Sequence, residues 1–313
     1  MGSLPLGPTL CCGLPATGGA PSGQAAHGLP CSAGQHPLQS VSLELTSILC
    51  MSQISVSLLQ TPLHWEDKAA NLQHFSQLLS QLPAGTQLAV LPEMFTTGFS
   101  MQPQLLAEPA DGPTVQWMRQ QARQHRIILA GSIIAEEAGQ YHNRLLWVQP
   151  DGQVAGYNKR HLFGYAGEDV HYRPGNSRVI VSVNGFRVLL QVCYDLRFPV
   201  WARQQPQPGG DAEYDVLLYV ANWPDRRIQA WRTLLQARAI ENQCYVVAVN
   251  RTGPDGHGNR HNGHSMVVSP MGEILLELTG ETELGQYTLV RQQLDEVRQQ
   301  LPFLKDRDTF FLQ

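Results

Sequence analysis

Residues 186–199 read FRVLLQVCYDLRFP, and they begin with a run of apolar residues that predicts a strand over Phe186–Val192. The pair Asn184-Gly185 directly before this run is typical of a tight hairpin turn. Cys193 then ends the strand, ahead of a loop that begins a helix. Catalytic groups of α/β sheets collect at the carboxyl ends of strands, so the Cys193 thiol is a candidate nucleophile.

Two other segments place a reactive side chain at the end of an apolar strand. In QLAVLPEMFTTGF, residues 87–99, Glu93 lies two residues past the strand Gln87–Leu91. In GYNKRHLF, residues 156–163, Lys159 closes the strand Gln153–Asn158. Three ionisable groups placed in the same way, far apart in sequence, indicate one constructed site.

These residue types suit the hydrolysis of an amide. A thiol with a pKa near 8.5 needs an adjacent base, and Glu93 would take the proton from Cys193 and later deliver it to ammonia. Lys159 and the backbone N–H of Tyr194 would stabilise the oxyanion. Each residue alone also has a structural interpretation, because a lone Cys at a strand end is most often a small core residue. A Lys or Glu in such a place could belong to a solvated turn or cap a loop.

The rest of the chain alternates helices with strands. Apolar spacing predicts helices over Glu66–Leu82, Pro113–His125 and Arg227–Asn242. The further strands expected are Gln53–Leu59, Ile127–Ala135, Tyr141–Gln149, Arg178–Ser182, Asp215–Ala221, Cys244–Asn250, Leu284–Leu289 and two that flank Pro270-Met271-Gly272. Interleaved elements with several hairpins favour two mixed sheets covered by helices on their outer faces.

Composition excludes several classes of protein. The 313 residues are 42% hydrophobic and carry a formal charge of −4, with no basic stripe for nucleic acid and no apolar run of 18 residues for a membrane span. The six cysteines include no C-x-x-C pair, so there is no zinc-ribbon or thioredoxin-like signature. Nothing in the sequence favours a disulfide, and we therefore expect a reducing compartment and a cytoplasmic location. There is no G-x-S-x-G nucleophile elbow and no Gly-Lys pair, so serine-hydrolase and P-loop chemistry are disfavoured.

Residues 1–50 differ in composition from the rest of the chain. They hold no Lys or Arg and a single charged residue, Glu44, among many Gly, Pro, Ser and Ala. This composition predicts a disordered leader, or an extension upstream of a start at Met51, ahead of a catalytic domain over 51–313. Gln205–Glu213 is rich in Pro and Gly and predicts a loop insertion.

The remaining candidates are weaker. His257, His261 and His264 could suggest a metal, but their Gly- and Asn-rich surroundings favour a polar loop near the pocket, and no metal site or cofactor is expected. We expect Cys244 to lie in the core, and Asp195 and Arg197 to pair structurally. The residues expected to line a substrate pocket are Phe99, Asn222 and Trp223.

The three segments together resemble a known family. LPEMFTTGF, YNKRHLF and VCYDLRFP are similar to the signature blocks of the nitrilase superfamily of carbon–nitrogen hydrolases. The resemblance implies a Glu–Lys–Cys triad of Glu93, Lys159 and Cys193, and a further glutamate, Glu168 in GEDVHYRPG, that orients the lysine. It also implies a four-layer αββα sandwich, commonly a homodimer, that acts on a small-molecule amide.

Within the superfamily, PEMFTTGFS, YNKRHLFGYAGEDVHYRPG and YVANWP look most like the omega-amidase branch. That resemblance implies hydrolysis of the terminal amide of 2-oxo acids such as 2-oxoglutaramate. The alternatives are a deaminated-glutathione amidase, a carbamoylase, a nitrilase, or a catalytically idle dimeric binding protein. An idle homologue would be expected to lose part of the triad, and here all four positions are intact. The sequence does not single out a residue to bind the substrate carboxylate.

Overall fold

A computed structural model describes residues 52–310, except for residues 206, 208–210 and 281–282. The predicted leader, residues 1–50, and the middle of the predicted insertion Gln205–Glu213 lie outside the described residues. Of that insertion, Gln205 and Glu213 are described: the Gln205 N–H donates to the Glu213 carboxylate at 2.9 Å, which also pairs with Arg178 at 2.9 Å.

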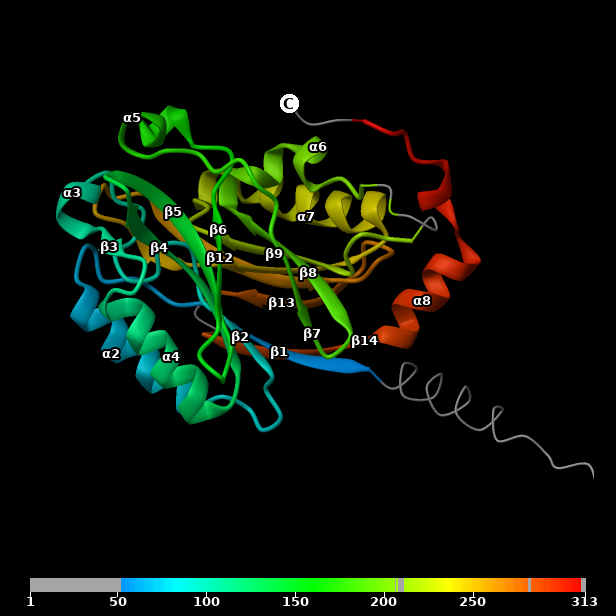
Figure 1. Cartoon of the computed structure of the whole chain (residues 1–313), viewed down its shortest axis with the longest axis horizontal. Helices are drawn as coiled ribbons and strands as arrows, with labels where there is room; N and C mark the ends of the chain where they lie inside the picture. Colours follow the sequence, from blue (N-terminus) through cyan, green and yellow to red (C-terminus); the bar gives the residue numbers. More distant parts are fainter. Residues whose placement is uncertain (1–51, 206, 208–210, 281–282, 311–313) are drawn as a thin grey trace, which may run out of the picture. The chain divides into compact units, whose positions relative to one another are not determined.

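The strands form two mixed sheets (Figure 1). In the first sheet the order is β14-β1-β2-β4-β5-β6, and β3 pairs with β4. Its strands are β1 Gln53–Leu59, β2 Leu88–Val90, β3 Glu108–Pro109, β4 Ile128–Glu137, β5 Gln140–Val148, β6 Val154–Asn158 and β14 Leu284–Val290. In the second the order is β11-β12-β10-β9-β8-β7, and β13 pairs with β12. Its strands are β7 Ile180–Val183, β8 Phe186–Val192, β9 Val216–Ala221, β10 Tyr245–Asn250, β11 Thr252–Pro254, β12 Arg260–Val268 and β13 Ile274–Thr279.

Helices cover the outer face of each sheet. Figure 1 shows α2 and α4 side by side against the first sheet, and α7, in yellow, over the second. The helices are α2 Lys68–Leu79, α3 Pro103–Leu106, α4 Pro113–His125, α5 Glu168–His171, α6 Pro199–Ala202, α7 Ile228–Asn242 and α8 Arg291–Gln300. None of the helices in the described ranges combines the length and the apolar composition that a bilayer-crossing helix needs.

Three layers of apolar side chains hold these elements together. One lies between the two sheets, one between the first sheet and α2 and α4, and one between the second sheet and α7. Strand β9 shows how a single strand serves two layers. Val216, Leu218 and Val220 point between the sheets, whereas Leu217 and Tyr219 point toward α7. Burial on both faces explains why such strands are nearly continuous apolar runs. The predicted αββα sandwich is therefore confirmed.

The direction of the strands decides where the site forms. β2 and β4 run parallel, and β6 runs in the same direction because both β4 and β6 are antiparallel to β5. In the second sheet β8, β9 and β10 are parallel. The chain therefore leaves β2 toward Glu93, β6 toward Lys159 and β8 toward Cys193, each at the carboxyl edge of its sheet.

Local boundaries differ from the sequence analysis in a few places. The predicted helix Glu66–Leu82 begins later, since Asp67 is its N-cap and accepts a hydrogen bond from the Ala70 N–H at 3.0 Å. The Asn184-Gly185 hairpin is confirmed, with φ of 45° and 80° at its two residues, as a type I′ turn requires.

Candidate active site

A lysine lies between two carboxylates at the carboxyl edge of the first sheet. The Lys159 Nζ is 2.9 Å from Glu93 Oε1, and 3.0 and 2.9 Å from the two carboxylate oxygens of Glu168. All three side chains are completely buried. Each direct contact is a charge-assisted hydrogen bond, which is how a protein offsets the cost of removing charges from water.

The two carboxylates keep Lys159 charged. Burial alone would lower the pKa of the ammonium, but the negative charges of Glu168 and Glu93 outweigh it and raise that pKa. Burial and the charge of Glu93 raise the pKa of Glu168, against the opposing effect of Lys159. The ammonium is therefore a fixed positive charge throughout the neutral pH range.

Asparagines from both sheets hold Glu93 in place. The Asn143 side-chain amide, on β5, donates to Glu93 Oε1 at 2.7 Å. The backbone N–H of Asn222, just past β9, donates to Glu93 Oε2 at 2.8 Å. The Asn222 side-chain amide also donates to the Glu93 main-chain oxygen at 2.6 Å. Glu93 thus joins the edges of the two sheets, and its carboxylate has one orientation.

Cys193 occupies a sharp turn between β8 and the short 3-10 helix Cys193–Arg197. Its φ of 44° lies in the left-handed region, which is uncommon for a residue with a side chain. Asp195 fixes the turn, because its carboxylate accepts the Val192 N–H at 3.0 Å and the Tyr157 hydroxyl at 2.8 Å. A strained backbone conformation persists only where contacts with the surrounding residues impose it, and such conformations are typical of functional sites.

The Cys193 thiol is protonated at neutral pH. Burial raises its pKa well above the ordinary value, and the charge of Glu93 and a hydrogen bond to Glu93 raise it further, against the effect of Lys159. A neutral thiol is a weak nucleophile. Attack on a substrate therefore requires a base that removes the proton, and Glu93 is the carboxylate beside it.

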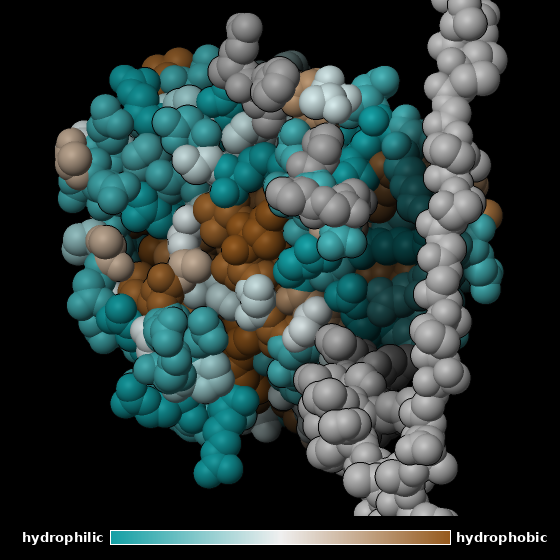
Figure 2. Space-filling view, turned by 45° about the vertical axis from the view of Figure 1, so that its right-hand side comes forward, coloured by the Kyte–Doolittle hydropathy of each residue, from teal (hydrophilic) through white to brown (hydrophobic). Residues whose placement is uncertain are grey.

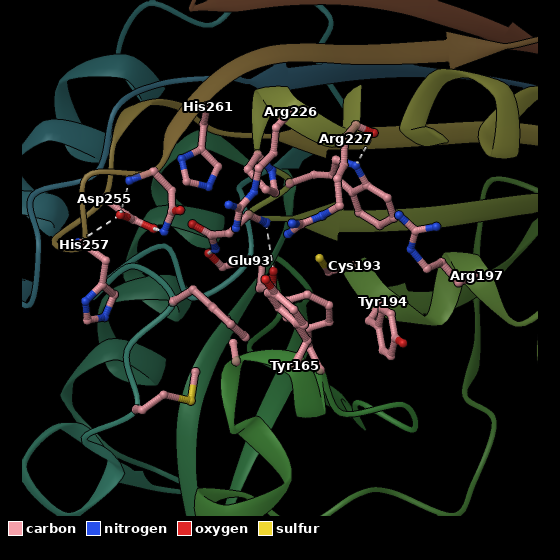
Figure 3. Close-up of a pocket in the computed structure, with 18 residues that line it drawn as sticks. Glu93, Tyr165, Cys193, Tyr194, Arg197, Arg226, Arg227, Asp255, His257 and His261 are labelled. Atoms are coloured by element: carbon pink, nitrogen blue, oxygen red, sulfur yellow. Dashed lines mark hydrogen bonds between the residues drawn. The ribbon is translucent and has the colours of Figure 1, made fainter. Parts of the chain in front are cut away.

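The thiol opens into a cavity of about 310 Å³ (Figure 3). The sequence-predicted residues that line it are Glu93, Phe99, Cys193, Tyr194, Asn222 and Trp223. Lys159 and Glu168 are not among the lining residues, but the Lys159 Nζ lies 5.1 Å from the ring centre of Phe99, which is one of them. The binding roles of Phe99, Asn222 and Trp223, and the oxyanion role of the Tyr194 N–H, stay predictions.

The expected pairing of Asp195 with Arg197 is wrong. Asp195 accepts hydrogen bonds from the His161 backbone N–H at 2.9 Å and from the His161 ring at 2.8 Å. Arg197 instead lines the cavity, with its guanidinium 4.8 Å from the Trp223 ring centre. A position two residues away in a 3-10 turn points in a different direction, so adjacency in sequence did not predict contact.

Two of the three histidines lie at the cavity and the third does not. His257 and His261 line the cavity, whereas His264 lies on β12 and pairs with Glu277 at 2.6 Å. Burial lowers the pKa of His261 to about 4, assisted by the charge of Arg251, so its ring is neutral. Cys244 is fully buried between the second sheet and α7, as expected.

Several residues of the site carry no sequence signal. Asn143 lies on a strand that contains several polar residues, so one more is not conspicuous. Nothing in the neighbouring sequence indicates that Asn143 contacts Glu93. The cavity wall also contains Arg197, Arg226 and Arg227. The pair Arg226-Arg227 reads in the sequence as a solvated start of a helix.

Comparison with known proteins agrees with this geometry. Residues 55–299 match the carbon–nitrogen hydrolase family. The chain is 43% identical to the omega-amidase YafV of Escherichia coli strain K12 over 267 residues, which are 84% of this chain and all of that protein. It is 31% identical to the 2-oxoglutaramate amidase of Bacillus subtilis, covering 80% of this chain and 96% of the relative.

Comparison with solved structures also finds members of the nitrilase superfamily. A CN-hydrolase superfamily protein from Xanthomonas campestris, with an arsenic adduct in its active site, superposes with a TM-score of 0.82 at 41% identity. The match covers 84% of this chain and all of that one. The nitrilase-superfamily member Nit3 of Saccharomyces cerevisiae superposes with a TM-score of 0.70 at 26% identity, covering 81% of this chain and 96% of that one.

Glu168→Gln tests whether Glu168 positions Lys159. The substitution leaves one buried cation facing one buried anion, so the melting temperature should change little. The turnover number for amide hydrolysis should fall about 100-fold, the cost of a small misplacement of a catalytic group, while KM stays similar because Glu168 does not line the cavity.

Glu277→Gln is the matched control, because Glu277 also lies outside the lining and pairs with basic side chains, but these are Arg232 and His264 and not Lys159. It should leave the turnover number unchanged. Wild-type turnover in Glu168→Gln would show that Glu168 does not act on Lys159.

Proposed function

The chain belongs to the carbon–nitrogen hydrolase family of the nitrilase superfamily, and from this premise we propose that it is an omega-amidase. The substrates are small 2-oxo dicarboxylic acid monoamides, such as 2-oxoglutaramate, and the related succinamate. One observation carries the proposal: a thiol beside the buried Glu93–Lys159 pair opens into a cavity whose wall holds three arginines. The thiol and the buried pair suit attack on an amide. The arginines suit a substrate that carries a negative charge at its other end.

In the first half of the reaction, Glu93 takes the proton from the Cys193 thiol while the sulfur attacks the amide carbon. The pKa of the thiol is raised, so proton removal accompanies attack and a preformed thiolate is not needed. The positive charge of Lys159 and the Tyr194 N–H stabilise the oxyanion. When the intermediate collapses, protonated Glu93 gives its proton to the departing nitrogen, and ammonia leaves a thioester on Cys193.

In the second half, the same carboxylate activates water. Glu93 takes a proton from a water molecule as its oxygen attacks the thioester carbon. Collapse breaks the carbon–sulfur bond, the proton returns to sulfur, and the new carboxylic acid ionises on release. The hydrogen bonds from Asn143 and Asn222 keep Glu93 oriented for both proton transfers.

Ammonia release from a panel of amides tests this function. Wild-type protein should release ammonia from 2-oxoglutaramate and succinamate much faster than from glutamine, asparagine, a simple nitrile, an N-carbamoyl amino acid or deaminated glutathione. Cys193→Ala should abolish release, because the nucleophile is gone, whereas Cys244→Ala should retain it. Carbon dioxide formation would indicate a carbamoylase.

The proposed substrate class would be wrong if deaminated glutathione were the best substrate, as the name of a Synechocystis relative at 31% identity would suggest. Near-wild-type rates in Cys193→Ala would overturn the choice of nucleophile. No ammonia release from any of these substrates would favour a catalytically idle homologue.

We also propose that the chain forms a homodimer, as the family resemblance implies. Figure 2 shows apolar side chains gathered at the centre of one face, with hydrophilic side chains around them. Val200, Ile240 and Met271 are further large apolar residues that are exposed. Apolar surface of this kind is typical of protein interfaces. Light scattering should give the mass of two chains, and the mass of one chain would contradict the proposal. The cytoplasmic location stays a prediction.

A further inference from the structure

We propose that Arg227 binds the far carboxylate of the substrate, the one that hydrolysis does not create. This inference rests on the proposed function and names the specificity-determining residue of the same site. Of the three arginines of the cavity wall, Arg227 is half-buried, has no acidic partner among the described residues, and is linked through Phe163 to the buried catalytic cluster.

The Arg227 guanidinium is half-buried without an acidic partner. Among the residues that the structure describes, no carboxylate pairs with it and no acceptor takes a hydrogen bond from its side chain. Its neighbour is the ring of Phe163, whose centre lies 5.2 Å from the guanidinium carbon. Burial lowers the pKa of Arg227, and the positive charge of Arg226 lowers it further. An anion beside the guanidinium would relieve both effects.

Arg227 also lines the same cavity as the nucleophile. Figure 3 shows Cys193 and Arg227 together in the lining of this cavity. The terminal carbons of a four- or five-carbon dicarboxylate are about 4–5 Å apart, given carbon–carbon bonds near 1.5 Å. A substrate of that length is small enough for the cavity of about 310 Å³ that both residues line, and a planar guanidinium binds a carboxylate with two parallel hydrogen bonds.

The other arginines suit this role less well. Arg226 is exposed, so its charge is hydrated and screened by salt. The guanidinium of Arg197 lies over the Trp223 ring, much as that of Arg227 lies over Phe163. Among the described residues, however, Phe163 donates to Glu168, whereas Trp223 makes no hydrogen bond to the Glu168–Lys159 cluster. The described part of the wall contains two acidic residues, Glu93 and Asp255. Asp255 accepts hydrogen bonds from the N–H groups of His257 and Asn259, at 2.9 and 2.8 Å, and from the Asn259 side-chain amide at 2.9 Å.

Phe163 fixes Arg227 relative to the buried ion cluster. Its ring supports the guanidinium, while its backbone N–H donates to Glu168 at 2.6 Å, and Glu168 binds Lys159. At the other end of the side chain, the Arg227 carbonyl accepts a hydrogen bond from the Trp223 ring N–H at 2.8 Å. The carboxylate site and the catalytic cluster therefore share supports, which sets the distance between them.

The test compares Arg227→Met on a charged amide and on a neutral amide of equal length. Succinamate carries the carboxylate, and butanamide has a methyl group in its place. Loss of a bidentate, charge-assisted contact should lower kcat/KM for succinamate about 100-fold, while kcat/KM for butanamide stays within about threefold. Arg227→Lys keeps the charge without the planar fork and should recover part of the succinamate activity.

Arg226→Met compares the exposed neighbour in the same wall, and it should lower kcat/KM for succinamate by less than about fivefold because the charge of Arg226 is hydrated. Equal losses on both amides in Arg227→Met would overturn the proposal, because they would indicate a structural role. So would a 100-fold loss in Arg226→Met with none in Arg227→Met. Wild-type protein that hydrolyses butanamide but neither succinamate nor 2-oxoglutaramate would overturn the proposed function, and this inference with it.

Discussion

The buried contact between Lys159 and two glutamates is the interaction on which the site depends. Each of these ions loses several kcal/mol of hydration when it is removed from water, and only close, well-oriented partners offset that cost. The ammonium therefore requires a carboxylate within about 3 Å, and the structure provides two, Glu93 and Glu168. This requirement fixes the ends of β6 and β2 relative to each other and orients the Glu93 carboxylate beside Cys193.

The site also holds the two sheets together at one edge. Apolar side chains fill the space between the sheets, but at the carboxyl edge the contacts are polar. Glu93, from the first sheet, accepts the Asn222 N–H from the second. Tyr157 and His161, from the first, bind Asp195, which follows β8 in the second. A change in how the sheets stack would therefore move the carboxylate and the thiol apart, so packing and chemistry are coupled.

Much of the fold follows from local sequence. Gln53–Leu59 and Phe186–Val192 have the strand bounds that the sequence predicts, because the first alternates apolar with polar residues and the second is a mostly apolar run after a hairpin turn. By contrast, α8 was not predicted, because only Leu294 of it is buried and its apolar stripe consists of Leu294 and Val297 alone. The triad was predicted because each member follows an apolar strand. Asn143 and Arg227 were not, because their roles depend on which distant segments face them.

The central claim is that Cys193 carries the acyl group during turnover. The most direct measurement is rapid quenching of the protein with excess 2-oxoglutaramate, followed by mass spectrometry of the intact chain and of its peptides. We predict an added mass equal to the substrate less ammonia, on the peptide that contains Cys193, and no added mass in Cys193→Ala. Turnover with no adduct on any peptide at the earliest quench times, or an adduct on Cys244, would contradict this account.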